Sequence, residues 1–195
     1  MAAFNTEPAA PGGTLTQEAI QFQGVILDAS SSPIVIGPSV QTIEVPAGGG
    51  AVVLFQVHCE NISDCDETAF KLVYANSVAP TIYQQVPNVE TADGTWMWGV
   101  TTEQNQNTGS RNARLTGSCA VTTGSTQVTS DQIPAVDLPQ DGCTVLGYIV
   151  RVGSSTAGTT FEYRLITESG LELAGGYDQI ARIKVVNPMA SGIGF

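Results

Sequence analysis

Charged residues are scarce in this sequence, and positive charges are scarcer than negative ones. Asp, Glu, Lys and Arg make up 13% of the 195 residues, about half of the usual share of about 25%. There are 7 Lys and Arg against 18 Asp and Glu, which gives a formal net charge of −11. Because nucleic-acid affinity depends on clustered Lys and Arg, this composition argues against a nucleic-acid-binding protein.

The sequence also lacks a long hydrophobic run. No stretch of about 18 apolar residues occurs, so we expect no membrane-spanning helix. The first residues, MAAFNTEPAAPGG, have no basic start and no extended apolar centre, which argues against a secretory signal. Apolar residues nevertheless make up 42% of the chain and recur along its whole length. This composition argues against a disordered chain.

Histidine is nearly absent, and we find no motif of a hydrolase or a nucleotide-binding enzyme. The only histidine is His58, which directly precedes Cys59 at the end of an apolar run. Adjacent strand residues point to opposite faces, which argues against a Cys–His pair here; a pairing with Cys119 or Cys143 across the fold is the alternative. The sequence has no G-x-S-x-G elbow, G-x-G-x-x-G loop or P-loop. We therefore expect a protein that is not an enzyme and binds no cofactor.

Short β-type runs make up most of the sequence. They are rich in Val, Ile, Thr and aromatic residues, and Gly/Pro turns separate them. The segment Phe161–Leu165 alternates apolar and charged residues, as in a half-buried strand. Ala51–Val57 is almost continuously apolar, as in a strand that is buried on both faces. We predict strands over residues 22–27, 33–36, 40–45, 51–57, 68–74, 95–101, 115–122, 144–152, 160–167 and 180–186.

These runs predict an all-β fold, either a β-sandwich or a jelly roll. We place the β-sandwich domain at residues 20–186, between an extended N-terminal arm (residues 1–19) and a C-terminal tail (residues 187–195). One helical turn over residues 14–20 is a further possibility within the arm. Residues 101–130 are rich in Thr, Ser, Asn, Gln and Gly, which is typical of a long loop or a weak edge strand.

Both ends of the chain carry apolar residues that suit contacts with a partner. Extended arms of one subunit can pair with the sheet edges of another and add backbone hydrogen bonds along an open edge. We therefore predict that the arm and the tail bind the partner. The residues predicted to make these contacts are Phe4, Leu15, Ile20, Met189 and Phe195.

The four cysteines leave their pairing open. Cys59 and Cys65 bracket a short loop and could form a disulfide, whereas Cys119 and Cys143 lie in or beside predicted strands. Buried reduced thiols are one alternative, and one or two disulfides are another. A zinc site is a third, but a second histidine and a recognised ligand spacing are absent. The acidic loop around Asp64 lacks the Gly and distal Glu of a calcium-binding loop, so we expect no metal.

The most distinctive segment runs from Ile133 to Val152 and continues through Gly158-Thr159-Thr160 into a further strand. It consists of a Pro-containing turn, an Asp-Gly pair and a strand with Gly147 near its centre. This pattern resembles a segment of virion proteins of tailed bacteriophages, especially capsid decoration (cement) proteins and head-fibre proteins. The resemblance covers about 35 of the 195 residues and concerns the pattern of turns and strands.

The resemblance implies a structural virion protein, a capsid decoration protein that docks on the outside of a phage capsid and stabilises it. The implied partner is the major capsid protein, and the implied location is the capsid surface after assembly in the host cytoplasm. An acidic surface suits this role because it keeps free subunits soluble before they dock. A homotrimer would bury apolar faces on a shared axis.

Two tryptophans support an alternative function. Trp96 and Trp98 lie two positions apart, so both rings share one face of a strand. Such rings fill a core or a subunit interface, or they form a platform on which sugar rings stack. The second case predicts a carbohydrate- or receptor-binding module of a phage tail fibre.

Overall fold

The structure of the chain, a computed structural model, describes residues 13–26, 41–60, 65–77, 82–97, 121–127 and 136–187. Within these ranges every regular element is a β-strand, and there is no helix long and apolar enough to cross a membrane. The strands are β1 (Thr14–Ile26), β2 (Thr42–Pro46), β3 (Gly50–Glu60), β4 (Cys65–Thr68), β5 (Phe70–Asn76), β6 (Gln84–Gln85), β7 (Thr95–Met97), β8 (Val121–Gln127), β9 (Val136–Leu138), β10 (Cys143–Val152), β11 (Thr160–Thr167), β12 (Gly176–Tyr177) and β13 (Ala181–Val186).

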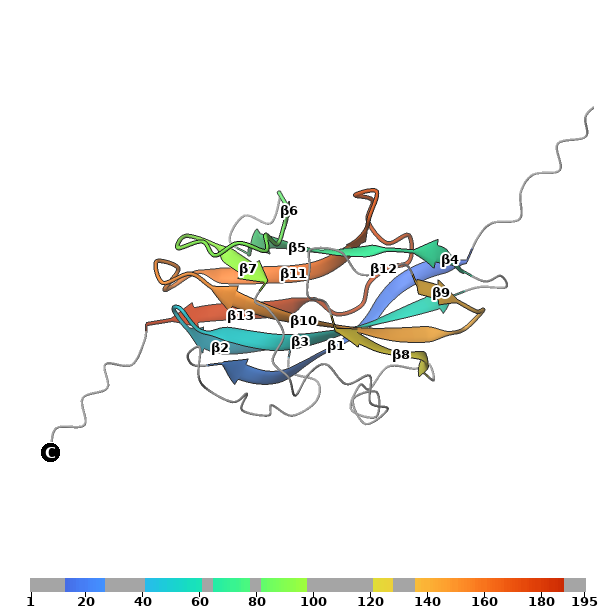
Figure 1. The fold of residues 1–195 in the computed structure, drawn as a ribbon, viewed down its shortest axis with the longest axis horizontal. Coiled ribbons are helices and arrows are strands. Elements are labelled where there is room, and N and C mark those ends of the chain that lie inside the picture. The colour runs from blue at the N-terminus through green and yellow to red at the C-terminus, as the bar shows by residue number, and fades with distance from the viewer. Residues whose placement is uncertain are drawn as a thin grey trace, which may run out of the picture.

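The strands form two main sheets that pack as a β-sandwich (Figure 1). The six-stranded sheet has the order β12-β1-β3-β10-β7, and β8 also pairs with β10. The five-stranded sheet has the order β2-β13-β11-β5-β6, and β4 and β9 form a separate small sheet. Most pairs are antiparallel, but β12, β8 and β2 each pair in parallel with a neighbour. The predicted all-β sandwich is confirmed, with mixed sheets.

The hydrophobic core lies between the two sheets. From the six-stranded sheet it receives alternate residues of β3 and β10, including Phe55 and Tyr148, whose rings meet edge to face at 5.8 Å. From the five-stranded sheet it receives alternate residues of β5, β11 and β13, including Leu72, Tyr163 and Ile183. Because strand side chains alternate between faces, each sheet is left with a second face that points away from this core.

The sequence pattern predicted these burial patterns well. β3 is buried on both faces along most of its length, as expected for residues 51–57, and β10 is buried at every position. In β2, Ile43 and Val45 are buried while Thr42 and Glu44 are exposed, as their alternation predicts. The Gly-rich turn between β2 and β3 is also confirmed; Gly48 has a φ of 80°, which glycine adopts without steric strain.

The predicted helical turn over residues 14–20 is wrong. These residues begin β1, which pairs with β3 along its whole length. Gln17 is fully buried, and two hydrogen bonds satisfy its side chain there. The side-chain amide donates to the Gln179 carbonyl at 2.6 Å and accepts from the Leu165 amide at 2.9 Å. The sandwich therefore starts at Thr14 in β1, and residues 14–19 belong to a sheet and not to an arm.

Other differences concern short elements. Residues 65–67, which we interpreted as part of an acidic loop, form β4 together with Thr68, and β4 pairs with β9. The predicted strands at 95–101 and 115–122 are each described only in part, as β7 and the first residues of β8. The predicted strand at 33–36, most of the polar segment 101–130 and nearly all of the C-terminal tail lie outside the described residues.

Candidate functional site

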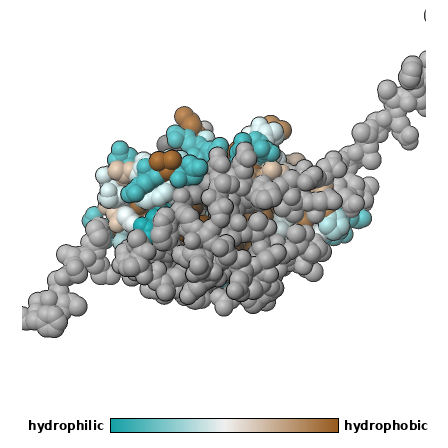
Figure 2. Space-filling view, in the orientation of Figure 1, coloured by the Kyte–Doolittle hydropathy of each residue, from teal (hydrophilic) through white to brown (hydrophobic). Residues whose placement is uncertain are grey.

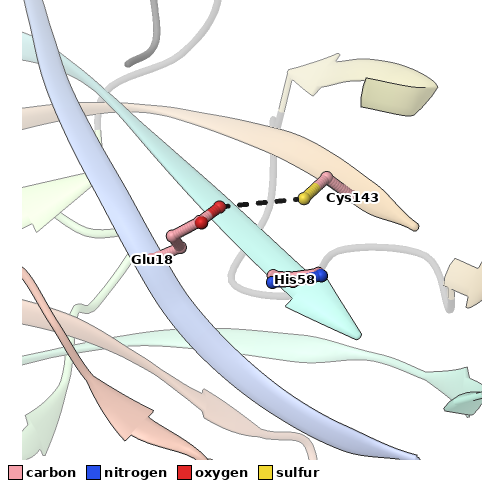
Figure 3. A group of neighbouring side chains, drawn as sticks. All are labelled: Glu18, His58 and Cys143. Carbon is pink, nitrogen blue, oxygen red and sulfur yellow. Dashed lines mark hydrogen bonds between the residues drawn. The ribbon is translucent and has the colours of Figure 1, made fainter. Parts of the chain in front are cut away.

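One group of polar side chains in the described structure combines three different metal-binding residue types. Glu18 of β1, His58 of β3 and Cys143 of β10 each offer one ligand-type atom, and these atoms all lie within 4.8 Å of one another (Figure 3). The three strands are adjacent in the six-stranded sheet. The residues are far apart in sequence, so only the sheet brings them together.

The register of the sheet explains how these residues meet. Cys143 lies directly opposite His58 in the antiparallel pair of β10 and β3. On the other side of β3, the β1 strand has a bulge between Gln17 and Ala19 that leaves Glu18 as the extra residue. Thr16 pairs with His58, and Glu18 follows two positions later, so strand alternation puts Glu18 on the face of β3 that holds His58.

Gln56 connects two members of the group. Its side-chain amide donates to Glu18 Oε2 at 2.9 Å and lies 3.6 Å from Cys143 Sγ. Glu18 Oε2 and Cys143 Sγ are 3.9 Å apart, the pair joined by the dashed line in Figure 3. Because Cys143 takes part in a disulfide, its sulfur has no proton to donate, and we treat this second pair as a contact.

The imidazole of His58 is incompletely paired. Its Nδ1 lies 3.9 Å from Glu60 Oε1, which is beyond hydrogen-bond distance, and its side chain is 14% exposed. Its Nε2 is buried and has no hydrogen-bond partner among the described residues. Buried polar atoms normally have a partner, so an unpaired ring nitrogen at this position needs an explanation.

The cysteines are oxidised in this structure. Cys59 and Cys65 form a disulfide, one of the pairings that the sequence left open. Cys143 is also disulfide-bonded, and the remaining cysteine, Cys119, lies outside the described residues. The alternative of four reduced thiols is therefore wrong. In the oxidised state Cys143 offers no thiolate, the form that acts as nucleophile and metal ligand.

Of the five residues predicted to bind a partner, the structure describes two. Ile20 is 2% exposed and belongs to the core, and Leu15 packs against that core, so both are structural in the described chain. Ile20 therefore presents no exposed surface to a partner in the described structure, whereas a partner contact of Leu15, which is only partly buried, stays a prediction. Phe4, Met189 and Phe195 lie outside the described residues.

The predicted sugar platform is not open at Trp96. Its side chain is only 6% exposed, and it lies in β7 opposite Arg151 of β10. A ring that stacks on a sugar must present a face to solvent. Trp98 lies outside the described residues. The described part of the chain therefore offers no exposed tryptophan for the alternative function, a carbohydrate- or receptor-binding module.

The sequence analysis missed a cationic group on the second face of the five-stranded sheet. We call this surface the outer face and define its cations as Lys71, Arg164, Arg182 and Lys184. These residues alternate with core residues along β5, β11 and β13, so they point away from the core. The alternation was visible in the sequence, but the strands that carry these residues are neighbours only in the folded sheet.

Carboxylates and tyrosines surround these cations. Lys184 pairs with Glu44 at 2.7 Å and Arg182 with Glu162 at 3.3 Å, in both cases between direct cross-strand neighbours. The Arg164 guanidinium pairs with Glu172, and its carbon lies 3.5 Å from the ring centre of Tyr83 and 4.9 Å from that of Tyr177.

Comparison with known proteins adds no relative: no family model matches the chain, and no curated protein matches it. Two features of the described structure remain as candidate sites, the Glu18–His58–Cys143 group in the six-stranded sheet and the charged outer face of the five-stranded sheet.

Proposed function

We propose that the chain is a structural virion protein, a decoration protein that docks on the outside of a phage capsid and stabilises the shell. The resemblance of residues 133–152 to phage virion proteins supports the class of protein. The observation that carries the proposal is the distribution of charge, because it distinguishes one sheet face from the rest of an acidic chain. Docking is proposed to occur through this outer face.

The outer face holds most of the positive charge of the chain. Four of the 7 Lys and Arg residues lie there. Three carboxylates pair with these cations, so the group carries 4 − 3 = +1. The rest of the chain then has 3 cations and 15 acids, or −12. The acidic remainder repels an acidic partner, whereas the outer face does not.

The ion pairs of the outer face can open, so that their cations can bind carboxylates of another protein. The side chains of Lys184 and Glu44 are 54% and 60% exposed. Exposed pairs of this kind contribute about 0 to 1 kcal/mol to stability. Lys184 can therefore turn to a carboxylate of a docking partner at small cost. We propose an acidic patch of the major capsid protein as that partner.

Figure 2 shows that the coloured surface at the upper edge of the molecule is mostly hydrophilic, with isolated brown spots. The exposed large apolar residues of the described chain are Ile82, Val89 and Leu171. Single exposed apolar residues are normal on soluble proteins and form no docking patch by themselves. The charged side chains of the outer face are therefore the proposed contacts.

Chain ends and sheet edges complete the proposed docking mode. β2 and β6 end the five-stranded sheet, and an edge strand can accept a strand from another chain. We retain Phe4, Met189 and Phe195 as proposed contacts, in the segments on either side of the sandwich. Many weak contacts in a homotrimer then add up through multivalency.

Co-sedimentation with capsid shells that lack the chain tests the proposal. Lys71→Gln with Lys184→Gln removes two positive charges from the outer face. Ser154→Glu with Ser155→Glu makes the same change in net charge at two exposed positions that lie outside this face. We expect the first variant to bind about tenfold more weakly at low salt and the second to bind like the unmodified chain.

Three results would contradict the proposal. The first is that the unmodified chain does not sediment with any shell. The second is that both double variants lose the same affinity for the shell. A loss that persists at high salt would also exclude an electrostatic contact, because salt screens exposed charges over about 8 to 10 Å.

Removal of residues 1–12 tests the role of the N-terminal segment. Because β1 begins at Thr14, this deletion spares the sandwich, whereas removal of residues 1–19 would delete half of the pairing with β3. We expect the shorter chain to keep its unfolding temperature and to occupy fewer shell sites. Full occupancy would show that Phe4 and its neighbours make no docking contact.

A further inference from the structure

We propose that Glu18, His58 and Cys143 form a zinc site when the disulfide of Cys143 is reduced. This inference is independent of the proposed function. Carboxylate, imidazole and thiolate are the three side-chain groups that zinc binds in proteins, and sites with three protein ligands keep a fourth position for water. The group offers one ligand of each kind.

The geometry is close to that of a tetrahedral ion. Zinc–ligand distances of about 2.0 to 2.3 Å place neighbouring ligand atoms about 3.5 Å apart. Glu18 Oε2 and Cys143 Sγ are 3.9 Å apart, and no two ligand atoms of the group are more than 4.8 Å apart. Side-chain shifts of about 1 Å would therefore bring all three groups to one ion.

Two neighbours suit a second shell around this ion. A metal-bound histidine usually donates its other ring nitrogen to a carboxylate, and Glu60 lies 3.9 Å from His58 Nδ1. The Gln56 amide donates to Glu18 Oε2 at 2.9 Å and so orients this carboxylate, as a second-shell group does for a metal ligand. The unpaired Nε2 of His58 is then explained as the nitrogen that would bind the ion.

Cys143 is the only described cysteine that faces this group. Cys59 is adjacent to His58 in β3 and therefore points to the opposite face, where it belongs to the core between the sheets. Cys65 belongs to the same core. Reduction of the Cys59–Cys65 disulfide therefore adds no ligand to the site.

The redox step is a thiol–disulfide exchange. A dithiol reductant transfers two electrons and two protons to the disulfide of Cys143 and becomes a disulfide itself. The freed Cys143 thiol then loses its proton to solvent as its sulfur binds zinc. Reducing compartments keep thiols in this form, and oxidising ones favour the disulfide seen here. The chain would therefore exchange a bound ion for a disulfide between the two environments.

Cobalt titration tests the proposal on the full chain. The protein is reduced with dithiothreitol, freed of it by gel filtration without oxygen, and titrated with Co²⁺ and then with Zn²⁺. We expect one equivalent of Co²⁺ to produce a thiolate-to-cobalt charge-transfer absorption that Zn²⁺ abolishes. We expect the oxidised protein to bind Co²⁺ more than about 100-fold more weakly than the reduced protein, because the Cys143 thiolate is missing. Loss of a direct ligand weakens metal binding more than loss of a second-shell group does.

Matched variants assign the ligands. Cys143→Ser should abolish the charge-transfer absorption, and Glu18→Gln and His58→Ala should each weaken binding by about tenfold or more. Cys59→Ser with Cys65→Ser should keep the absorption. Near-ultraviolet circular dichroism verifies that each variant folds. If Cys143→Ser does not fold, Glu18→Gln tests the site instead, because it keeps every cysteine. The proposal is wrong if reduced protein gives no charge-transfer absorption, or if the Cys59/Cys65 variant loses it.

Discussion

The two sheets of the sandwich differ in what their second faces do. Both give one face to the shared core. In the six-stranded sheet the second face is also buried, with Val52 and Leu54 at 2% and 1% exposure, and it carries the Glu18–His58–Cys143 group. In the five-stranded sheet the second face is the charged outer face. The comparison indicates that the second face of the six-stranded sheet serves the interior, whereas the second face of the five-stranded sheet keeps exposed charges such as Lys184 beside buried residues such as Val73.

Truncation of an apolar side chain to alanine on each of the two second faces gives the largest expected contrast. Leu54→Ala removes a fully buried side chain from β3, which typically costs about 2–5 kcal/mol of unfolding free energy. Val186→Ala removes a partly exposed one from β13, which we expect to cost less than about 1 kcal/mol. Urea denaturation measures both values. Equal losses would show that the two second faces are buried alike.

Gln17→Leu tests whether the sheets are joined by buried hydrogen bonds. The substitution leaves the Leu165 amide and the Gln179 carbonyl without the Gln17 side chain, and an unsatisfied buried group costs about 1–3 kcal/mol. Gln84→Leu, at an exposed position of β6, is the control and should change stability by less than about 0.5 kcal/mol. Thermal unfolding measures the stability of both variants. An unchanged stability of Gln17→Leu would show that these hydrogen bonds do not stabilise the packing of the two sheets.

Two buried tyrosines, one from each sheet, give the smallest and most specific contrast. The Tyr163 hydroxyl of the five-stranded sheet donates to Thr95 Oγ1 at 2.8 Å, so Tyr163→Phe should cost about 1 kcal/mol. The Tyr148 hydroxyl of the six-stranded sheet is buried without a partner among the described residues. Tyr148→Phe should therefore be neutral or stabilising by up to about 1 kcal/mol. A loss in both variants would show that the Tyr148 hydroxyl is paired.

The same two tyrosines give a pH dependence. Burial raises the pKa of the Tyr148 and Tyr163 phenols above the usual value of 10. Above pH 10 the unfolded chain loses these protons while the folded chain keeps them, so the unfolding free energy falls as pH rises. Below pH 10 their contribution is constant. Each Phe variant should flatten the alkaline fall, and denaturation at pH 9 and pH 11 measures it; an unchanged slope would contradict the assigned cause.

Apolar alternation allowed most of the sandwich to be predicted from the sequence. β11 was placed at its observed bounds, and the buried residues of β2 were assigned to the correct face. The start of β1 was missed because Thr16 and Gln17 are polar but buried. The hydrogen-bond partners of the Gln17 side chain are more than 140 residues away, and no local pattern reveals such contacts.

The candidate site was less predictable than the fold. A meeting of His58 with Cys143 was one alternative that the sequence left open, but only the register of β3 and β10 shows that the two residues lie opposite each other. Glu18 was not noticed, because the pairing of β1 with β3 that brings it to His58 is not visible in the local sequence. The outer face was missed for a related reason, since its cations come from three strands that are separated in sequence.

The mass of the purified chain in solution, measured by light scattering, tests the proposed role in assembly most directly. The account predicts a homotrimer of about three times the chain mass of 20.3 kDa. Lys71→Gln with Lys184→Gln should leave this mass unchanged, because the outer face is proposed to meet the shell and not a sister subunit. A monomer of 20.3 kDa at every concentration tested would contradict the proposed trimer.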